Sequence, residues 1–422
     1  MILSNISVPL VGMVDTGVTG HLENAAYLGA VAIGATIFGF LYTGVNFLRM
    51  GTTGIAAQRF GAGDAEGLRT SLGQALIVAF SVALVLLVLQ KPIGLFALDL
   101  LGADPDVRHF AGQYFFIRIW SAPATLANFA LIGWFIGLQN ARVPLVIVLV
   151  INVTNVVLDL ALVLIFGMKV DGVAAASVVA EFAGMFAGLA VAAAELKRRG
   201  GRWDRSQLLT LRAYTGFLSV NGHLLVRTLA LMFTFGFVTA QGARQGGLIL
   251  AANAILMNLQ NLLSFALDGF AHAAEALVGK AVGAKSRDAL QQSVRLTLRW
   301  SLYVALGFCA LFLVGGPLFI NVLTDLPGVR ATTLRYLPWM IISPLVSVWS
   351  FLYDGVFVGA TRAREMRNIM VISTFVVFIP AFYALSFLGN NGLWLAFMLF
   401  MASRGIGMHY FYKARVLPAI PL

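Results

Sequence analysis

The sequence predicts an all-α integral membrane protein whose twelve transmembrane helices form two parallel-repeat six-helix bundles with a central cleft. The first observation behind this prediction is composition: 59% of the 422 residues are hydrophobic and 11% are charged, whereas a soluble domain carries roughly 25% charged residues. The second is a series of apolar runs of spanning length, and the third is an internal repeat. Together they exclude a soluble enzyme.

Apolar runs recur along the whole chain, and about 20 helical residues suffice to cross the hydrocarbon core of a bilayer. Lys and Arg gather in alternate connections, which places both termini in the cytoplasm by the positive-inside rule. The formal net charge of +11 therefore reflects loops that meet anionic headgroups, and no nucleic acid is expected as a partner. The expected spans are residues 1–20, 27–48, 70–90, 108–137, 143–166, 171–194, 213–240, 248–277, 290–316, 329–359, 368–388 and 392–412.

The two halves of the chain repeat in a single register. FGAGDAEGLRTSL resembles VGAKSRDALQQSV, and FIGLQNAR resembles FVGATRAR, each 222 positions further on. Each copy of the repeat contains six helices. Because six is an even number, both copies have the same orientation in the membrane. The matched positions are Gly61 with Gly283, Gly137 with Gly359, and Pro105 with Pro327. We expect an N-lobe over 1–194 (helices 1–6), a cytoplasmic linker over 195–212 and a C-lobe over 213–422 (helices 7–12).

Polar residues interrupt the fifth expected span. Asn152, Asn155 and Asp159 are three and four positions apart, so they lie along one face of a helix. A carboxylate at membrane depth costs at least about 2.5 to 3.5 kcal/mol, so Asp159 needs a partner, a proton or a cation.

The rest of the first half offers partners for Asp159. Asp15 follows Pro9 in the first span, and a proline bends a transmembrane helix. If the two aspartates face each other, one of them could hold a proton; alternatively, Asp15, Asn155, Asp159 and Ser177 could supply oxygen ligands for Na⁺.

Three further polar residues of the first half have two interpretations each. Asn128 in the fourth span and Ser177 in the sixth either take part in ion binding or join helices by hydrogen bonds, which is the commoner use of such residues. Glu181 in the sixth span is either an interhelical hydrogen-bonding residue or a coupling carboxylate.

The second half is polar at other positions. Asp268 and Glu275 share a face of the eighth span, and an ion pair of Asp268 with Arg227 is favoured over a substrate role because charges inside membranes usually pair. Asp354 in the tenth span has no basic neighbour within one turn. Met257 is a candidate lining residue of the cleft, since soft side chains suit a site that accepts several ligands.

Four motifs resemble one family along essentially the whole chain: SNISVPLVGMVDTGVTGHL, RMGTTGIAAQRFGAGD, LDGFAHAAEALVGKAVGAK and DGVFVGATRAREMRN. They are similar to the DinF-like branch of the multidrug and toxic compound extrusion (MATE) family. The resemblance implies the MATE fold and ion-driven export of amphipathic, often cationic, organic compounds. It also implies an ion site at Asp15, Asn155, Asp159 and Ser177, with a looser match at Asn128. Relatives have more residues before Ser4, so a first helix shortened at its cytoplasmic end is expected.

The sequence therefore favours an antiporter with alternating access, driven by H⁺, with Na⁺ as the alternative coupling ion. The runner-up is a flippase for a lipid-linked precursor, which would need a cationic cleft, and the identifiable cations within spans are chiefly Arg227 and Arg118. An enzyme is not expected, because the five histidines are scattered without metal-ligand spacing. No cofactor besides the coupling ion is expected, and the protein is expected to be a monomer of the cytoplasmic (inner) membrane.

Overall fold

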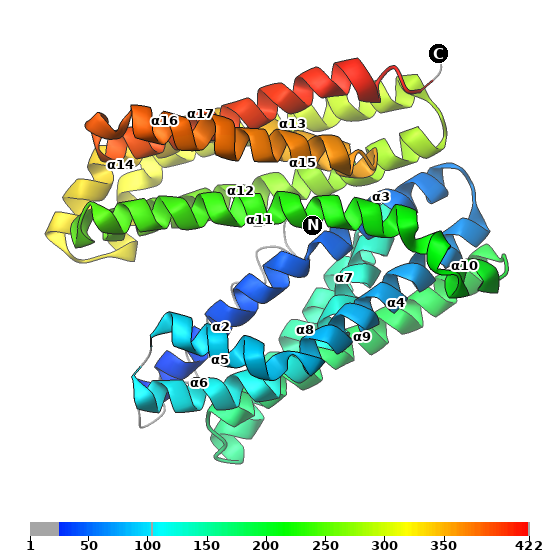
Figure 1. Ribbon diagram of the computed structural model, residues 1–422, viewed down its shortest axis with the longest axis horizontal. Coiled ribbons are helices and arrows are strands. Elements are labelled where there is room, and N and C mark those ends of the chain that lie inside the picture. Colours follow the sequence, from blue (N-terminus) through cyan, green and yellow to red (C-terminus); the bar gives the residue numbers. More distant parts are fainter. Residues whose placement is uncertain (1–24, 103, 421–422) are drawn as a thin grey trace. The chain divides into compact units, whose positions relative to one another are not determined.

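The computed structural model describes residues 25–102 and 104–420, and its secondary structure there is helical (Figure 1). The first expected span, 1–20, and with it Asp15 and the expected shortening of the first helix, lies outside the described residues. The chain folds into two compact units, of which the first runs to Phe217 and the second begins at Leu218. The division into lobes at 194 and 213 stays a prediction.

The first unit is built from helices that lie alongside one another, with α4, α7, α8 and α9 forming one group (Figure 1). The segments labelled η are short 3₁₀ or π-helical stretches. The elements are α2 (Ala25–Val45), α3 (Phe47–Gly61), α4 (Ala65–Val88), α5 (Gln90–Leu101), α6 (Pro105–Arg118), η1 (Ile119–Ser121), α7 (Ala122–Gly137), α8 (Arg142–Asp159), η2 (Leu160–Ile165), α9 (Val170–Arg199), α10 (Arg205–Leu209) and η3 (Leu211–Tyr214).

In the second unit, α12 and α14 pack along their lengths, and α17 packs on α14. Its hydrophobic core gathers large side chains such as Phe312, Trp394 and Phe397. The elements are α11 (Thr215–Arg244), which crosses the boundary between the units, α12 (Gly247–Gly283), α13 (Arg287–Leu323), α14 (Pro327–Gly359), α15 (Ala363–Ile372), η4 (Ser373–Phe378), α16 (Ile379–Ala384), η5 (Ser386–Leu388), α17 (Asn390–Phe411) and η6 (Tyr412–Val416).

Ten helical stretches of the described residues are long and apolar enough to cross a membrane. In order, they match the second to the eleventh expected spans, from 26–61 to 363–384. The twelfth expected span is helical as α17 but is not among the ten; its interior carries Arg404, which is almost fully buried. The fold is therefore that of a multi-pass helical membrane protein, as predicted.

The repeat seen in the sequence is present in the helix packing. In the first unit, a Cβ added to Gly133 of α7 would overlap the backbone oxygen of Arg49 in α3. In the second unit, a Cβ on Gly355 of α14 would overlap the backbone oxygen of Ala271 in α12. Both pairs are related by the same shift of 222 positions. The α3–α7 and α12–α14 crossings are thus the same contact made twice, and each needs a glycine to bring two backbones together.

The helix ends repeat in the same register. Asp64 caps α4 by accepting a hydrogen bond from the Gly67 amide at 2.7 Å, and Ser286 caps α13 by accepting one from the Ala289 amide at 3.3 Å. The turns after α7 and α14 each use one residue with positive φ, Gln139 (61°) and Thr361 (52°).

Candidate ion-coupling site

Two glycines bring α8 and α9 close together in the first unit. A Cβ on Gly188 would lie 2.9 Å from Cδ1 of Ile147, and a Cβ on Gly184 would overlap the Ile151 side chain. Because side chains four positions apart share a helix face, the face of α8 that carries these isoleucines continues to Asn155 and then to Asp159. Close packing of α8 on α9 therefore places a polar patch inside the unit.

This patch contains three of the residues predicted to bind the coupling ion. Asp159 is fully buried, and Asn155 is 2% exposed. The side-chain amide of Asn155 donates to the hydroxyl of Ser177 in α9, with an Nδ2–Oγ distance of 3.4 Å. Asn152, on the same stripe of the sequence, is only half-buried. A carboxylate, an amide and a hydroxyl provide oxygen atoms suited to a proton or to a small hard cation such as Na⁺.

The backbone changes form immediately after Asp159. This residue ends the α-helical part of the span, and η2 continues it as a π-helix over Leu160–Ile165. π-Helical turns are rare and occur frequently at functional sites. The buried carboxylate therefore lies next to the segment of α8 that departs from regular helix.

Asn128 of α7, also predicted to bind the ion, has its hydrogen bonds elsewhere. Its amide nitrogen donates to a carboxylate oxygen of Glu181 in α9 at 2.8 Å and to the backbone oxygen of the same residue at 3.0 Å. The interhelical hydrogen-bonding interpretation of Asn128 and Glu181 thus describes their geometry.

Sequence reasoning missed the hydroxyl groups around this pair. Ser121 at the end of η1 and Thr125 and Asn128 of α7 are buried and lie on one helix face, at spacings of four and three. The Ser121 hydroxyl bonds to that of Tyr42 in α2 at 2.9 Å and accepts from that of Thr125 at 3.4 Å. The signal was present as polar residues at helical spacing in the fourth span.

The second unit holds a different buried charge cluster. Asp354 of α14 pairs with Arg227 of α11 and, at 2.8 Å, with Arg404 of α17. Asp354 lies on the buried face of α14, where both guanidinium groups reach it. The predicted pairing of Arg227 with Asp268 stays a prediction; Asp268 acts electrostatically on Arg404.

Helical spacing alone could not identify Arg404 as a partner of Asp354. The arginine lies 50 positions further along the chain. Its signal was a lone arginine inside the last apolar run. A second intramembrane cation on Asp354 makes this cluster more basic than the sequence indicated.

The other two residues singled out in this half have packing roles in the structure. Met257 packs against the hydrophobic core of the second unit. Glu275 is buried at the α12–α14 crossing, where a Cβ on Gly359 would lie 2.5 Å from its backbone oxygen. Whether either residue also contacts a substrate stays a prediction.

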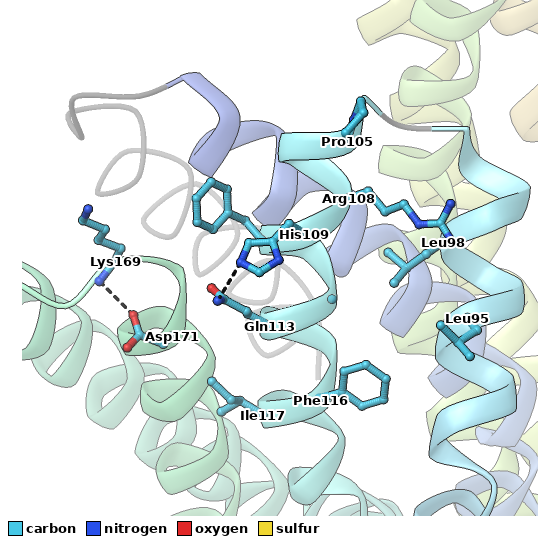
Figure 2. A pocket seen from close by; sticks show the side chains of 12 residues that line it. Leu95, Leu98, Pro105, Arg108, His109, Gln113, Phe116, Ile117, Lys169 and Asp171 are labelled. Carbon is cyan, nitrogen blue, oxygen red and sulfur yellow. Dashed lines mark hydrogen bonds between the residues drawn. The ribbon is translucent and has the colours of Figure 1, made fainter.

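A pocket of about 980 Å³ lies at one end of α5 and α6 in the first unit (Figure 2). Leu95, Leu98 and Phe116 form its apolar wall, and the His109 ring bonds to Gln113 at 3.1 Å beside it. Lys169 and Asp171, which precede and open α9, lie across from them (Figure 2). Of the predicted ion-coupling and cleft residues that the structure describes, none lines this pocket, so it is distinct from the buried carboxylates.

The repeated helical unit agrees with the family comparison. The MatE family profile matches residues 1–161 and again 224–384, which together are more than half of the chain. The chain belongs to the MatE family. The two matches coincide with the internal repeat, and MatE membership makes this a transporter of the multidrug and toxic compound extrusion class and not an enzyme.

Individual relatives agree with this assignment. The chain is 42% identical over 408 residues to DNA damage-inducible protein F of Escherichia coli K12, covering 97% of this chain and 89% of that protein. It is 25% identical to Protein DETOXIFICATION 44, chloroplastic, of Arabidopsis thaliana, covering 94% and 77% of the two chains. The MatE fold is seen in the crystal structure of MATE in the bent conformation, which matches with a TM-score of 0.91 at 17% identity, over 100% of this chain and 94% of that one.

Proposed function

We propose that this MatE transporter is an antiporter that couples inward flow of H⁺ to export of amphipathic, often cationic, organic compounds, with Na⁺ as the alternative coupling ion. The observation that carries the proposal is the complete burial of Asp159 within a span, one helical turn from Asn155. It acts by alternating access in the cytoplasmic membrane, as a monomer with both termini inside.

A buried carboxylate can act as an ion switch because its two states differ strongly in electrostatic cost. The charged form costs at least about 2.5 to 3.5 kcal/mol at membrane depth, and a bound proton or cation removes that cost. A conformation that opens the site to water favours the charged form, and one that closes it favours the loaded form. Loading and unloading of Asp159 can therefore shift the balance between two conformations, and the π-helical segment that follows it is the nearest part of α8 able to change form.

The substrate class rests on family membership and on the relatives. The E. coli and Arabidopsis proteins are named for a DNA damage response and for detoxification, and neither name specifies a compound. A forgiving apolar site encodes ligand shape only loosely, so we propose a class of substrates and not a single one.

The test is transport by purified protein in proteoliposomes, with ethidium, an amphipathic organic cation, as the probe. An acidic lumen and a sodium-loaded lumen are imposed separately. We expect the pH gradient to drive ethidium uptake, because protons leave as the cation enters. Uptake driven only by the sodium gradient would show that the coupling ion is Na⁺ and not H⁺. No uptake under either gradient would contradict the proposal.

A fluorescent phospholipid-flipping assay on the same vesicles separates the lipid flippase from the drug exporter. The proposal expects ethidium transport without gradient-dependent lipid flipping. Lipid flipping in vesicles that do not transport ethidium would contradict it.

A further inference from the structure

Glu181 is a second carboxylate inside a span of the first unit. It lies in the middle of α9, far from both ends of that helix, and is half-buried. Its carboxylate accepts a hydrogen bond from the side-chain amide of Asn128 at 2.8 Å. Thr125 interacts with the same carboxylate by hydrogen bonding, and Arg118 interacts with it electrostatically. This carboxylate is therefore solvated by protein groups.

The Asn128 amide can serve both protonation states of Glu181. Its nitrogen donates to the carboxylate, while its oxygen is buried and has no hydrogen-bond partner among residues 25–102 and 104–420. An amide carries a donor and an acceptor at the two ends of one rotatable group, so a half-turn presents the oxygen to a protonated carboxyl group.

A chain of hydroxyl groups leads away from Glu181. Thr125 donates to Ser121 at 3.4 Å, and Ser121 bonds to Tyr42 at 2.9 Å. Each hydroxyl can donate one hydrogen bond and accept another, so the row can pass a proton between α9 and α2. Within the described residues, the ionisable groups that act on Glu181 from neighbouring helices are Arg118 of α6 and Tyr42 of α2.

The Asp159 site is one helical turn away. Ser177 and Glu181 are four positions apart on α9, so their side chains are neighbours, about 5 to 6 Å apart at Cβ. Ser177 holds Asn155 of the Asp159 site at 3.4 Å. The Glu181 carboxylate and the Asp159 site are thus neighbours along one face of α9, with Ser177 between them.

We propose that Glu181, held by Asn128, is a second proton-binding carboxylate that exchanges its proton with the Asp159 site along α9. The proton binds a carboxylate oxygen and leaves the same oxygen, so no further reactant is needed. The use of this proton in transport rests on the proposed function, whereas its binding does not.

Infrared difference spectroscopy tests the binding directly. The protein is reconstituted in lipid and titrated from about pH 5 to about pH 9, and the carbonyl band of protonated carboxyl groups is followed. We expect Glu181→Gln to remove one titrating component and Asp159→Asn to remove a different one. Glu195→Gln is the control, because Glu195 lies near the end of the same helix and is paired with Arg198 and Arg199, so both components should remain.

Identical titrations of the wild type and Glu181→Gln would overturn the proposal. If Glu181→Gln does not fold, Asn128→Ala replaces it in the test. Loss of the hydrogen bond from the Asn128 amide should shift the midpoint of the Glu181 component to higher pH. An unchanged midpoint would also overturn the proposal. Ethidium transport by the wild type is measured in parallel. If the wild type shows no proton-driven transport while the Glu181 and Asp159 components still titrate, the proposed function is contradicted and the proton-binding proposal is not.

Discussion

At the scale of single residues, the two units treat a buried carboxylate in different ways. Asp354 of the second unit is paired with two guanidinium groups, whereas Asp159 of the first shares its helix face with the amide of Asn155. Removal of a carboxylate from between two arginines leaves two buried cations uncompensated. The Asp354 cluster is therefore suited to holding α11, α14 and α17 together, and the Asp159 site is suited to changing its charge.

We expect Asp354→Asn to destabilise the second unit by about 3 to 5 kcal/mol, because Arg227 and Arg404 lose the carboxylate that compensates them inside the membrane. The measurement is the thermal unfolding of the purified protein in detergent. Asp325→Asn is the control. It breaks the ion pair between Asp325 and Arg330, and because the Asp325 carboxylate is fully exposed, no change in Tm is expected. Equal Tm values for the Asp354 variant and the wild type would contradict a structural role.

The sequence was informative about residues whose partners are close along the chain. Asn155 and Asp159 could be placed on one face from their spacing alone. Arg404 and Glu181 could not be assigned partners, because their contacts, Asp354 and Asn128, lie on other helices many positions away. One-dimensional spacing carries no information about which helices become neighbours.

At the scale of helices, the repeat controls where backbones approach closely. Gly133 and Gly355 occupy equivalent positions, and each touches the backbone of a neighbouring helix. A methyl group there cannot be accommodated by rotating a side chain, since the atom that it meets is a backbone oxygen. The two crossings should therefore respond alike to substitution.

We expect Gly133→Ala and Gly355→Ala each to destabilise the protein by about 1 to 3 kcal/mol or more, the range for overpacking a well-packed interior. Thermal unfolding in detergent measures this. Gly236→Ala in α11 is the matched control, because its added Cβ meets no atom of the described residues within 4 Å and alanine favours a helix by up to about 1 kcal/mol. If the Gly133→Ala variant is as stable as the Gly236→Ala variant, the α3–α7 contact is not close-packed.

Helix positions could be predicted because apolar length is a strong signal, and the second to eleventh spans match the structure in order. The π-helical form of η2 and η4 could not be predicted, since neither segment contains a glycine or a proline. Their form depends on packing against neighbouring helices, which residue type does not encode.

At the scale of the whole molecule, the sequence established the family through motifs in both halves. The coupling ion was not accessible in this way, because a carboxylate, an amide and a hydroxyl suit H⁺ and Na⁺ alike. The exported compound was not accessible either, because an apolar site with soft side chains admits many shapes. These two properties require transport measurements.

The central claim is that Asp159 couples ion movement to export. It is tested most directly by ethidium uptake into proteoliposomes with an acidic lumen, comparing the wild type with Asp159→Asn. Asp171→Asn is the control, because Asp171 lies in the first turn of α9 beside the pocket and not at the buried site. We predict that Asp159→Asn, folded and reconstituted like the wild type, loses uptake driven by the pH gradient while Asp171→Asn keeps it. Undiminished proton-driven uptake by Asp159→Asn would contradict the claim.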